Sequence, residues 1–278
     1  MPQLPDGCSE TSLYPDDFIH TVDTLPVRLI RPADADHPSW VAYERPLHYL
    51  GTLHSQHDYD GRWHIQGTRE RHAALDDAVR VLRRPRSWRQ ERERVRRWAN
   101  RLLADPGLVV LDIQTTGLNE AWAVQIGATD RHGAVLIEEV LNPCAGIEAS
   151  ASALHGITAE RVSDAPTFSG LLPRITEVLS GQRCIAYNVT FDRGVLEREL
   201  HRLSGRQSTT WLDICRWEDA MRPYAAWKGL YSVHRCAYRY QPLGSSYNAV
   251  QNCRLLLHTL RQIGRTPQPR GCPCCPPA

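Results

Sequence analysis

The sequence predicts a mixed α/β domain over residues 107–264, with a small α+β module in front of it. Two observations carry this prediction. Short apolar segments of strand length alternate with longer segments in which apolar residues recur every three or four positions, which is the period of a helix packed on a sheet. The first three strand-like segments follow one another closely, as in hairpins, and the later ones are separated by helices, as in parallel crossovers.

The elements of this domain can be placed in order from the same pattern. Leu108 begins an apolar run that ends at Leu111 and predicts the first strand. Residues 121–129 and 134–141 predict the next two strands, because a polar turn that contains Gly133 separates them. The remaining segments predict a helix, a strand, a helix, a strand and a closing helix: residues 168–179, 183–187, 191–203, 209–214 and 247–263.

The first 82 residues divide into two parts. Residues 1–38 are rich in Pro and Asp and show no sustained period, so we expect an irregular N-terminal arm. Residues 39–82 predict a small α+β module of unknown role. Short alternating strands are expected over residues 40–66, and one apolar helix face is expected over residues 73–82.

Residues 83–106 form an arginine-rich joint between this module and the α/β domain. Residues 83–101 carry nine Arg against two Glu. This run allows two interpretations with equal weight. It could contact the backbone of a nucleic acid, or it could be a solvated amphipathic helix that packs on the next domain.

The composition is that of a globular chain without a membrane segment. The 278 residues have a formal net charge of +2, and no apolar run reaches the roughly 18 residues that suggest a membrane span. The first residues lack the basic start and apolar stretch of a secretory signal, so we expect a cytoplasmic protein whose nine cysteines stay reduced. The Pro- and Cys-rich tail of residues 265–278 could bind a metal, but a disordered tail is the favoured interpretation.

Asp112 follows the first apolar strand and is the first residue with an expected chemical role. Side chains two residues apart on a strand lie on the same face, so Asp112 and Gln114 point to the same side. Gly117 permits a tight turn in which a nucleotide could lie against the backbone. Carboxylates that converge at a strand edge can hold divalent metal ions.

Several ordered segments resemble the motifs of one enzyme family. Three of them resemble the motifs of DEDDh 3′–5′ exonucleases: residues 112–117 (Asp-Ile-Gln-Thr-Thr-Gly), 186–192 (Ala-Tyr-Asn-Val-Thr-Phe-Asp) and 247–252 (Tyr-Asn-Ala-Val-Gln-Asn). Residues 142–168 and 211–213 resemble segments that lie between these motifs. The match covers residues 107–262, and its order and spacing make it specific. The chain is thus similar to DNA polymerase III epsilon-like exonucleases, which implies a ribonuclease-H-like mixed sheet with flanking helices.

This resemblance also implies a set of functional residues. It implies that Asp112 and Asp192 are metal ligands and that the ion is Mg²⁺ or Mn²⁺. It implies a single-stranded 3′ end of DNA or RNA as the partner. The residues expected to touch the nucleic acid lie in the first two motifs: Thr115, Thr116, Gly117, Leu118, Asn188 and Phe191.

Three positions of the catalytic set depart from the family's four carboxylates and one histidine. Gln114 replaces a Glu, Tyr247 replaces the general-base His, and Asn252 replaces the last Asp. Amides offer no charge, and hard divalent cations favour carboxylates, so we expect the site to hold at most one ion well. A missing general base commonly costs about 10²–10⁴-fold in rate. We therefore expect a protein that binds or acts on single-stranded ends, with catalysis weakened or lost.

The sequence leaves two alternatives open. The chain could be an active metal-dependent 3′–5′ exonuclease with an atypical site, which recruits a further carboxylate such as Glu120 or Asp213. It could instead be a non-catalytic protein-interaction module on the same fold. A dense aromatic run over residues 217–240 also has two interpretations. It could be a stacking surface for bases, or it could pack the core beneath the last helices, which is the favoured interpretation.

Overall fold

A computed structural model describes residues 14–35, 37–45, 48–56, 61–204, 209–244 and 247–267. The chain forms two compact units and passes between them more than once. Unit 1 comprises Met1–Trp88 and Gly229–Arg239, and unit 2 comprises Arg89–Lys228 and Tyr240–Ala278. The first 13 residues of the expected arm and residues 268–278 of the expected tail lie outside the described residues.

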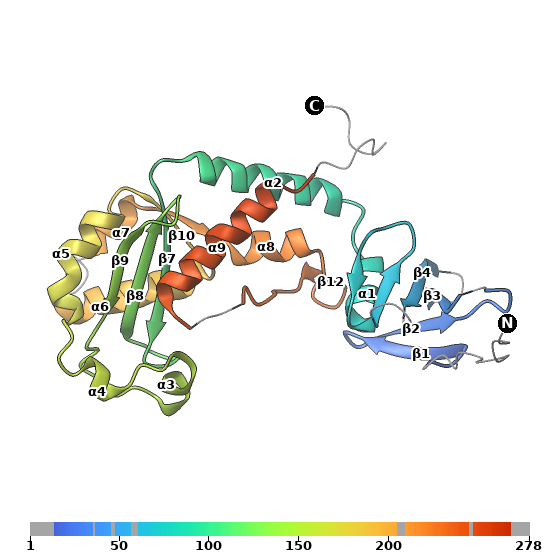
Figure 1. Ribbon diagram of the computed structural model, residues 1–278, viewed down its shortest axis with the longest axis horizontal. Coiled ribbons are helices and arrows are strands. Elements are labelled where there is room, and N and C mark those ends of the chain that lie inside the picture. The colour runs from blue at the N-terminus through green and yellow to red at the C-terminus, as the bar shows by residue number, and fades with distance from the viewer. Residues whose placement is uncertain are drawn as a thin grey trace, which may run out of the picture. The chain divides into compact units, whose positions relative to one another are not determined.

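Unit 1 is built on an antiparallel sheet with one helix in its core (Figure 1). Six strands of the described residues form this sheet, in chain order: β1 Asp17–Val22, β2 Leu25–Ile30, β3 Ser39–Arg45, β4 His48–Gln56, β5 Arg62–Ile65 and β6 Arg71–His72. The helix α1, Leu75–Leu82, buries Ala78 and Val79 in the same core. Trp40 and Trp63 also lie in this core, with ring centroids 5.5 Å apart. The predicted strands and helix of the small module are therefore present.

The first hairpin corrects the expectation of an irregular arm. Residues 17–30 form β1 and β2, which pair in antiparallel register. Val27 and Leu29 are fully buried and alternate with exposed residues, as in a half-buried strand. The alternation in β1 is hidden in the sequence because Ile19, an apolar residue, is 70% exposed on the opposite face.

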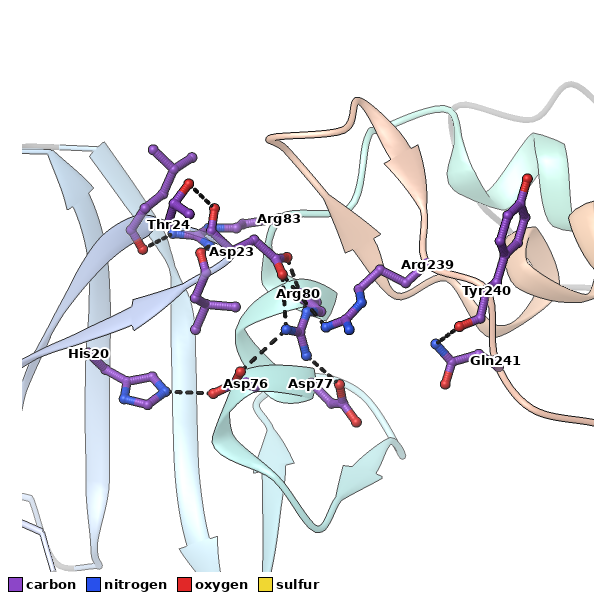
Figure 2. Close-up of polar contacts among 12 residues, drawn as sticks. His20, Asp23, Thr24, Asp76, Asp77, Arg80, Arg83, Arg239, Tyr240 and Gln241 are labelled. Carbon is purple, nitrogen blue, oxygen red and sulfur yellow. Dashed lines mark hydrogen bonds and ion pairs between the residues drawn. The ribbon is translucent and has the colours of Figure 1, made fainter. Parts of the chain in front are cut away.

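An ion-pair cluster, here called the Arg80 cluster, ties α1 to the turn between β1 and β2 (Figure 2). Arg80 is 6% exposed and donates hydrogen bonds to Asp23 at 3.0 and 3.1 Å. It also donates to Asp77 at 2.8 Å and to Asp76 at 3.3 Å. Asp23 and Thr24 have positive φ angles of 52° and 68°, as the most common two-residue hairpin turn requires. The hydrogen bond from Arg80 holds the pKa of Asp23 below its ordinary value.

A segment from far along the chain completes unit 1. Gly229–Arg239 contributes Leu230 to the buried core of this unit. Arg84 donates a hydrogen bond to the first carbonyl oxygen of the segment at 2.6 Å, and Arg239 lies 3.6 Å from the carboxylate of the β1–β2 turn. The segment contains two short strands: β12 Tyr231–Ser232 and β13 Ala237–Tyr238. The sequence predicts this segment as part of the α/β domain, because the partners of Leu230 lie more than a hundred residues away in sequence.

Unit 2 contains the mixed sheet that the sequence predicts. Five strands of the described residues form it: β7 Leu108–Thr115, β8 Ala123–Asp130, β9 Val135–Val140, β10 Arg183–Ala186 and β11 Arg216–Asp219. Their order is β11-β10-β7-β8-β9, with β7, β8 and β9 antiparallel and with β10 and β11 parallel to β7. The prediction of hairpins first and parallel additions later is confirmed.

Helices cover both faces of this sheet (Figure 1). The described helices that follow α1 are α2 Trp88–Ala104, α3 Ala149–His155, α4 Ala159–Val162, α5 Phe168–Leu179, α6 Val189–Ser204, α7 Thr210–Ile214, α8 Met221–Lys228 and α9 Ala249–Gly264, of which α3 and α4 lie at one end of the sheet. Val109 and Leu111 of β7 pack with α5 and α6, and Leu108 and Val110 pack with α2 and α9. No described helix is long and apolar enough to cross a membrane.

The segment after α6 differs from the prediction of a strand over residues 209–214. Residues 210–214 form the short helix α7, and the strand is the next segment, β11. Leu212 is buried, but Ile214 is 61% exposed, so these apolar residues do not mark a sheet. β11 lies at the edge of the sheet and carries mostly polar side chains, so its hydrophobic signal is weak.

The aromatic run of residues 217–240 is divided between the two units. Tyr224 and Trp227 stack with ring centroids 5.9 Å apart and belong to the core around α2 and α9. Tyr231 and Tyr238 meet edge to face at 5.4 Å in unit 1. Most of the run therefore packs within the protein, as the favoured interpretation had it.

Candidate functional site

Strand β7 and helix α6 bring two acidic side chains to one edge of the mixed sheet. β10 pairs with β7 only as far as Ile185 opposite Val110, so Asp112 lies beyond the end of this ladder. Helix α6 starts at Val189, shortly after β10, and carries Asp192 in its first turn. Because β7 and β10 are parallel, their carboxyl ends meet at this edge, and the two carboxylates are close enough to influence each other.

Asp192 is bonded to the strand that carries Asp112. It is 6% exposed, and its Oδ1 accepts a hydrogen bond from the backbone nitrogen of Ile113 at 2.9 Å. This bond satisfies a backbone donor just past the end of the β10 ladder. Asp192 therefore fixes α6 to β7 in addition to any ligand that it binds.

Two amide side chains surround the carboxylate of Asp112. Gln114 Nε2 donates a hydrogen bond to Asp112 Oδ2 at 2.6 Å, and Asn252 Nδ2 donates to the same oxygen at 3.2 Å. Gln114 comes from the same face of β7, as the strand period predicts, and Asn252 comes from α9. The structure thus brings together the replaced residues of the first and third motifs, with their NH₂ groups directed at one carboxylate oxygen.

The start of α9 is held against β8 by contacts that the sequence analysis missed. Gln125 is buried, and its Oε1 accepts a hydrogen bond from the backbone nitrogen of Ala249 at 3.0 Å. A Cβ atom at Gly127 would lie 2.6 Å from the backbone of Ala249 and Val250, so only glycine permits this approach. Asn252 follows within one turn and is thereby directed at β7. In the sequence, the signal for this contact is Gln125, a polar residue within an otherwise apolar strand.

The turn after β7 is fixed by side chains from a distant helix. His155 Nε2 donates to the carbonyl oxygen of Thr115 at 3.1 Å, and its Nδ1 accepts from a backbone nitrogen at 3.0 Å. The backbone nitrogen of Glu148 donates to the carbonyl oxygen of Thr116 at 2.8 Å. A Cβ atom at Gly117 would lie 2.1 Å from the carboxylate of Glu148. Glu148 therefore places a carboxylate directly against this turn, which the sequence motif does not reveal.

The remaining residues with an expected role in nucleic-acid binding differ in their surroundings. Leu118 is 81% exposed at the end of the turn and is available for contact. Asn188 is exposed just before α6, and its carbonyl oxygen accepts from the backbone nitrogen of Phe191. Phe191 packs partly against the core between the sheet and α5, which favours a structural role for its ring.

Tyr247 stands apart from the four residues Asp112, Gln114, Asp192 and Asn252, here called the amide–carboxylate cluster. It precedes α9 by two residues, has a positive φ angle of 49° and is 42% exposed. Among the described residues, no hydrogen bond or ion pair joins its side chain to Asp112 or Asp192. The position assigned to a general base is therefore occupied by a side chain that has no described hydrogen bond to either carboxylate.

Both carboxylates of the site have pKa values above the ordinary value of an aspartate. Burial raises the pKa of Asp112 to about 6, although the hydrogen bonds from Gln114 and Asn252 act in the opposite direction. Burial and the negative charge of Asp112 raise the pKa of Asp192 well above its ordinary range. The site therefore holds two acids that resist ionisation together.

These residues do not fit a pair of divalent cations. In the described part of the chain, no group of three His, Cys, Asp or Glu side chains could hold a metal ion. The side chain of Asp213 is 67% exposed and pairs with Arg193 at 3.2 Å, and Glu120 is exposed beyond the β7 turn. Neither adds a carboxylate to the pair, and amide N–H groups already bond to one oxygen of Asp112. A cation at that oxygen would have to displace them.

Comparison with known proteins agrees with the sequence motifs. A family model described as Exonuclease matches residues 109–241, a range that ends before the third motif. DNA polymerase III PolC-type of Bacillus cereus is 31% identical over 103 residues, which are 35% of this chain and 7% of that protein. DNA polymerase III subunit epsilon of Haemophilus influenzae is 27% identical over 125 residues, which are 41% of this chain and 48% of that protein. The chain spans half or less of the length of these curated relatives.

A solved structure of Exonuclease X in complex with 5′ overhanging duplex DNA also matches, with 24% sequence identity and a TM-score of 0.40. The match covers 57% of this chain and 92% of that chain. The family model, the curated relatives and the order of the first two motifs agree with one another. Residues 109–241 match an exonuclease family model, and the chain is similar to subunit epsilon of DNA polymerase III.

Proposed function

We propose that this chain binds single-stranded ends of DNA or RNA at the edge formed by β7, α6 and α9, with hydrolysis weakened or lost. One observation carries the proposal: Gln114 and Asn252 donate N–H groups to the same oxygen of Asp112. In a two-metal nuclease this oxygen would contact a cation. Here two neutral N–H donors bond to the carboxylate instead, so this oxygen has hydrogen-bond partners without a metal ion.

The charge of the site supports the same proposal. Two carboxylates can hold one Mg²⁺ or Mn²⁺ ion at most, together with a substrate phosphate. A second ion would lack the carboxylates that the family uses, because Gln114 and Asn252 carry no charge. Loss of the second ion removes the stabilisation of the leaving oxygen, and loss of a placed base removes about 10²–10⁴-fold in rate.

The turn after β7 supports binding. Its backbone is fixed by His155 and Glu148, so the exposed side chain of Leu118 is presented from a rigid support. The apolar side chain of Leu118 can contact a nucleobase whether or not a metal ion is bound at the candidate site. We therefore expect binding to survive the loss of the metal ligands.

The decisive experiment follows 5′-labelled single-stranded DNA and RNA through digestion in Mg²⁺ and then in Mn²⁺. It compares the native chain with Asp112→Ala/Asp192→Ala and with the restored variant Gln114→Glu/Tyr247→His/Asn252→Asp. We expect no metal-dependent shortening by the native chain and shortening by the restored variant. Cutting by the native chain that vanishes in the double alanine variant would instead establish an active exonuclease with an atypical site.

Fluorescence anisotropy on the same oligonucleotides measures binding separately from hydrolysis. Leu118→Ala is expected to lower the affinity several-fold, and Ile214→Ala is the matched control, because Ile214 is a 61% exposed apolar residue on α7. If the native chain binds neither DNA nor RNA at low salt, the proposal is wrong. A non-catalytic protein-interaction module would then be the remaining interpretation.

A further inference from the structure

Arginine side chains from three separate segments of unit 2 form a second surface, here called the basic ridge. Its members lie on α2, in the turn between β8 and β9, and at the end of α9: Arg94, Arg97, Arg101, Arg131, His132, Arg261 and Arg265. More than 160 residues separate its first and last members in sequence. The amide–carboxylate cluster does not include any of them.

The exposed face of α2 supplies the first part of the ridge. Arg94, Arg97 and Arg101 are exposed and are spaced by three and four residues, so they lie on one side of the helix. The opposite side buries Ala99 and Leu102 in the core of unit 2. The three guanidinium groups are thus spread over about 10 Å of helix, at 1.5 Å per residue.

Hydrogen bonds place the other two segments beside α2. Arg131 Nη1 donates to the carbonyl oxygen of Ala104, the last residue of α2, at 3.2 Å. Arg261 Nη2 donates to the carbonyl oxygen of Arg131 at 3.1 Å. Asn100 donates to the last carbonyl oxygen of α9 at 3.3 Å, and Figure 1 shows α9 ending beside α2. Main-chain oxygens accept these bonds, so the positive charges of Arg131 and Arg261 are not neutralised.

Three acidic side chains near the ridge have their shortest described contacts with groups outside it. Glu93 accepts two hydrogen bonds from Arg96, both at 2.7 Å, and reaches Arg97 only at 3.7 Å. Asp105 pairs with Arg183 at 2.7 Å, and Asp130 accepts from backbone nitrogens of its own turn. Within the described ranges, no ion pair involves the three ridge members Arg94, Arg101 and Arg265.

We propose that the basic ridge binds the sugar–phosphate backbone of a nucleic acid. Guanidinium groups are always charged and match phosphate oxygens with two parallel N–H donors. A row of guanidinium groups that has no described ion pair apart from Arg97 with Glu93 attracts a polyanion and releases its counterions on binding. An acidic protein surface would satisfy the charge alone, but the exonuclease-family domain that carries the ridge makes a nucleic acid the partner that both surfaces share.

Helix α9 gives the distance between the ridge and the candidate site. Asn252 and Arg265 are 13 residues apart on this helix and its C-cap, which corresponds to about 20 Å. A strand that rises 3.4 Å per stacked nucleotide needs roughly six nucleotides to span that distance. This length requirement rests on the proposed function, because it assumes that the end of the strand is held at the candidate site.

The test compares Arg94→Ala/Arg97→Ala/Arg101→Ala with a control that removes the same charge from other exposed positions, Arg69→Ala/Arg222→Ala/Arg235→Ala. Binding of labelled 20-nucleotide and 5-nucleotide single strands, both DNA and RNA, is measured by anisotropy from 50 to 200 mM salt. Each lost phosphate contact lowers the slope of log affinity against log salt by about 0.7. We expect the ridge variant to lose about 2 from this slope on the 20-mer, so that the native chain loses roughly 20-fold more affinity over that range.

The 5-mer and the control variant show whether a loss of binding is specific to the ridge. We expect the ridge variant to bind the 5-mer like the native chain, and the control variant to bind both strands with nearly native slopes. Equal slopes for the native chain and ridge variant on the 20-mer would overturn the proposal, as would an equal loss on the 5-mer. Equal affinity of the native chain for polyglutamate of matched charge would also overturn it.

Failure of the ridge and failure of the candidate site give different results. If Leu118→Ala weakens binding and the ridge variant does not, the proposed function stands and the ridge is not a nucleic-acid surface. If the native chain binds no strand at all, both proposals are wrong. Unfolding midpoints of the two triple variants show whether either substitution disturbs the fold.

Discussion

Each unit of this protein contains a cluster of carboxylates, which surrounds a buried arginine in unit 1 and lies at the candidate site in unit 2, and the charges of the two clusters are balanced in opposite ways. In unit 1, Arg80 lies among three Asp side chains and bonds to each of them (Figure 2). In unit 2, the hydrogen bonds that Asp112 and Asp192 accept from described residues come from amide and backbone N–H donors. The pKa of Asp23 is lowered by its bond to Arg80, whereas burial raises the pKa of Asp112 to about 6.

This difference indicates that the Arg80 cluster stabilises the fold, whereas the pair Asp112 and Asp192 is typical of a ligand-binding site. A buried charge is favourable only when an opposite charge and enough hydrogen bonds accompany it. The Arg80 cluster meets that condition. The pair Asp112 and Asp192 does not, and buried acids with raised pKa values are typical of sites shaped by a ligand rather than by folding.

The largest effect is expected when the Arg80 cluster is broken. Arg80→Met leaves three carboxylates around a buried apolar side chain and should lower the free energy of unfolding by about 3–5 kcal/mol. Urea denaturation of unit 1, followed through its tryptophans, measures this loss. Arg174→Met is the matched control, since Arg174 is exposed and forms its described ion pair with the exposed Glu177, and it should cost about 0–1 kcal/mol. Equal losses would show that the Arg80 cluster is not the stabilising one.

A cation should stabilise the second cluster only after its carboxylates are restored. In Gln114→Glu/Tyr247→His/Asn252→Asp, Mg²⁺ at 100 times its dissociation constant should add about 2.7 kcal/mol to the free energy of unfolding. The native chain should show little change, because two amides already bond to Asp112. Thermal melts with Mg²⁺ and with a chelator give both values. An equal Mg²⁺ shift in the native chain would contradict the proposed loss of metal sites.

The free energy of unfolding should depend on pH through Asp112. Its pKa is about 6 in the folded chain, above the ordinary value of 3.8, so between these values the folded chain keeps a proton that the unfolded chain has lost. Stability from this group is therefore complete below pH 4 and is lost as pH rises through 6, by roughly 2–3 kcal/mol in total. Asp112→Asn should remove most of that decline between pH 4.5 and 7.5. Asp213→Asn, at an exposed carboxylate, should leave it unchanged.

The smallest effect concerns the turn that the Arg80 cluster holds. Thr24 is β-branched and has a φ angle of 68°, which favours glycine. Thr24→Gly should relieve this strain and raise the free energy of unfolding by about 0.5–1 kcal/mol. Thr21→Gly, in the extended strand β1, should lower it by about the same amount. A loss in both variants would mean that the turn is not strained.

The sequence predicts the parts of the fold that local periodicity controls. β7, α5 and α9 have clear patterns, and the two-residue spacing correctly puts Asp112 and Gln114 on one face. The placement of Asn252 and Asp112 in one site is expected from the motif resemblance, but the orientation of the amide NH₂ groups is not. That orientation depends on how closely β8 approaches α9 at Gly127, which no local pattern records.

Other features depend on contacts between distant segments and could not be predicted. The carboxylate of Glu148 lies against Gly117, although 31 residues separate them in sequence. The basic ridge appears in the sequence only as the run on α2, because Arg131 and Arg265 join it through the packing of β8 and α9. The prediction put a strand at the apolar residues that form α7, because the true strand, β11, is mostly polar.

The insertion of Gly229–Arg239 into unit 1 has a consequence for the order in which the protein is made. Unit 1 begins with Met1–Trp88, but Leu230, which fills part of its core, is synthesised about 140 residues later. At roughly 5–20 residues per second, the first part waits about 7–28 s for its last core residue. During that interval the nascent chain exposes an apolar gap, so the time of greatest risk for aggregation falls while unit 2 is still emerging from the ribosome.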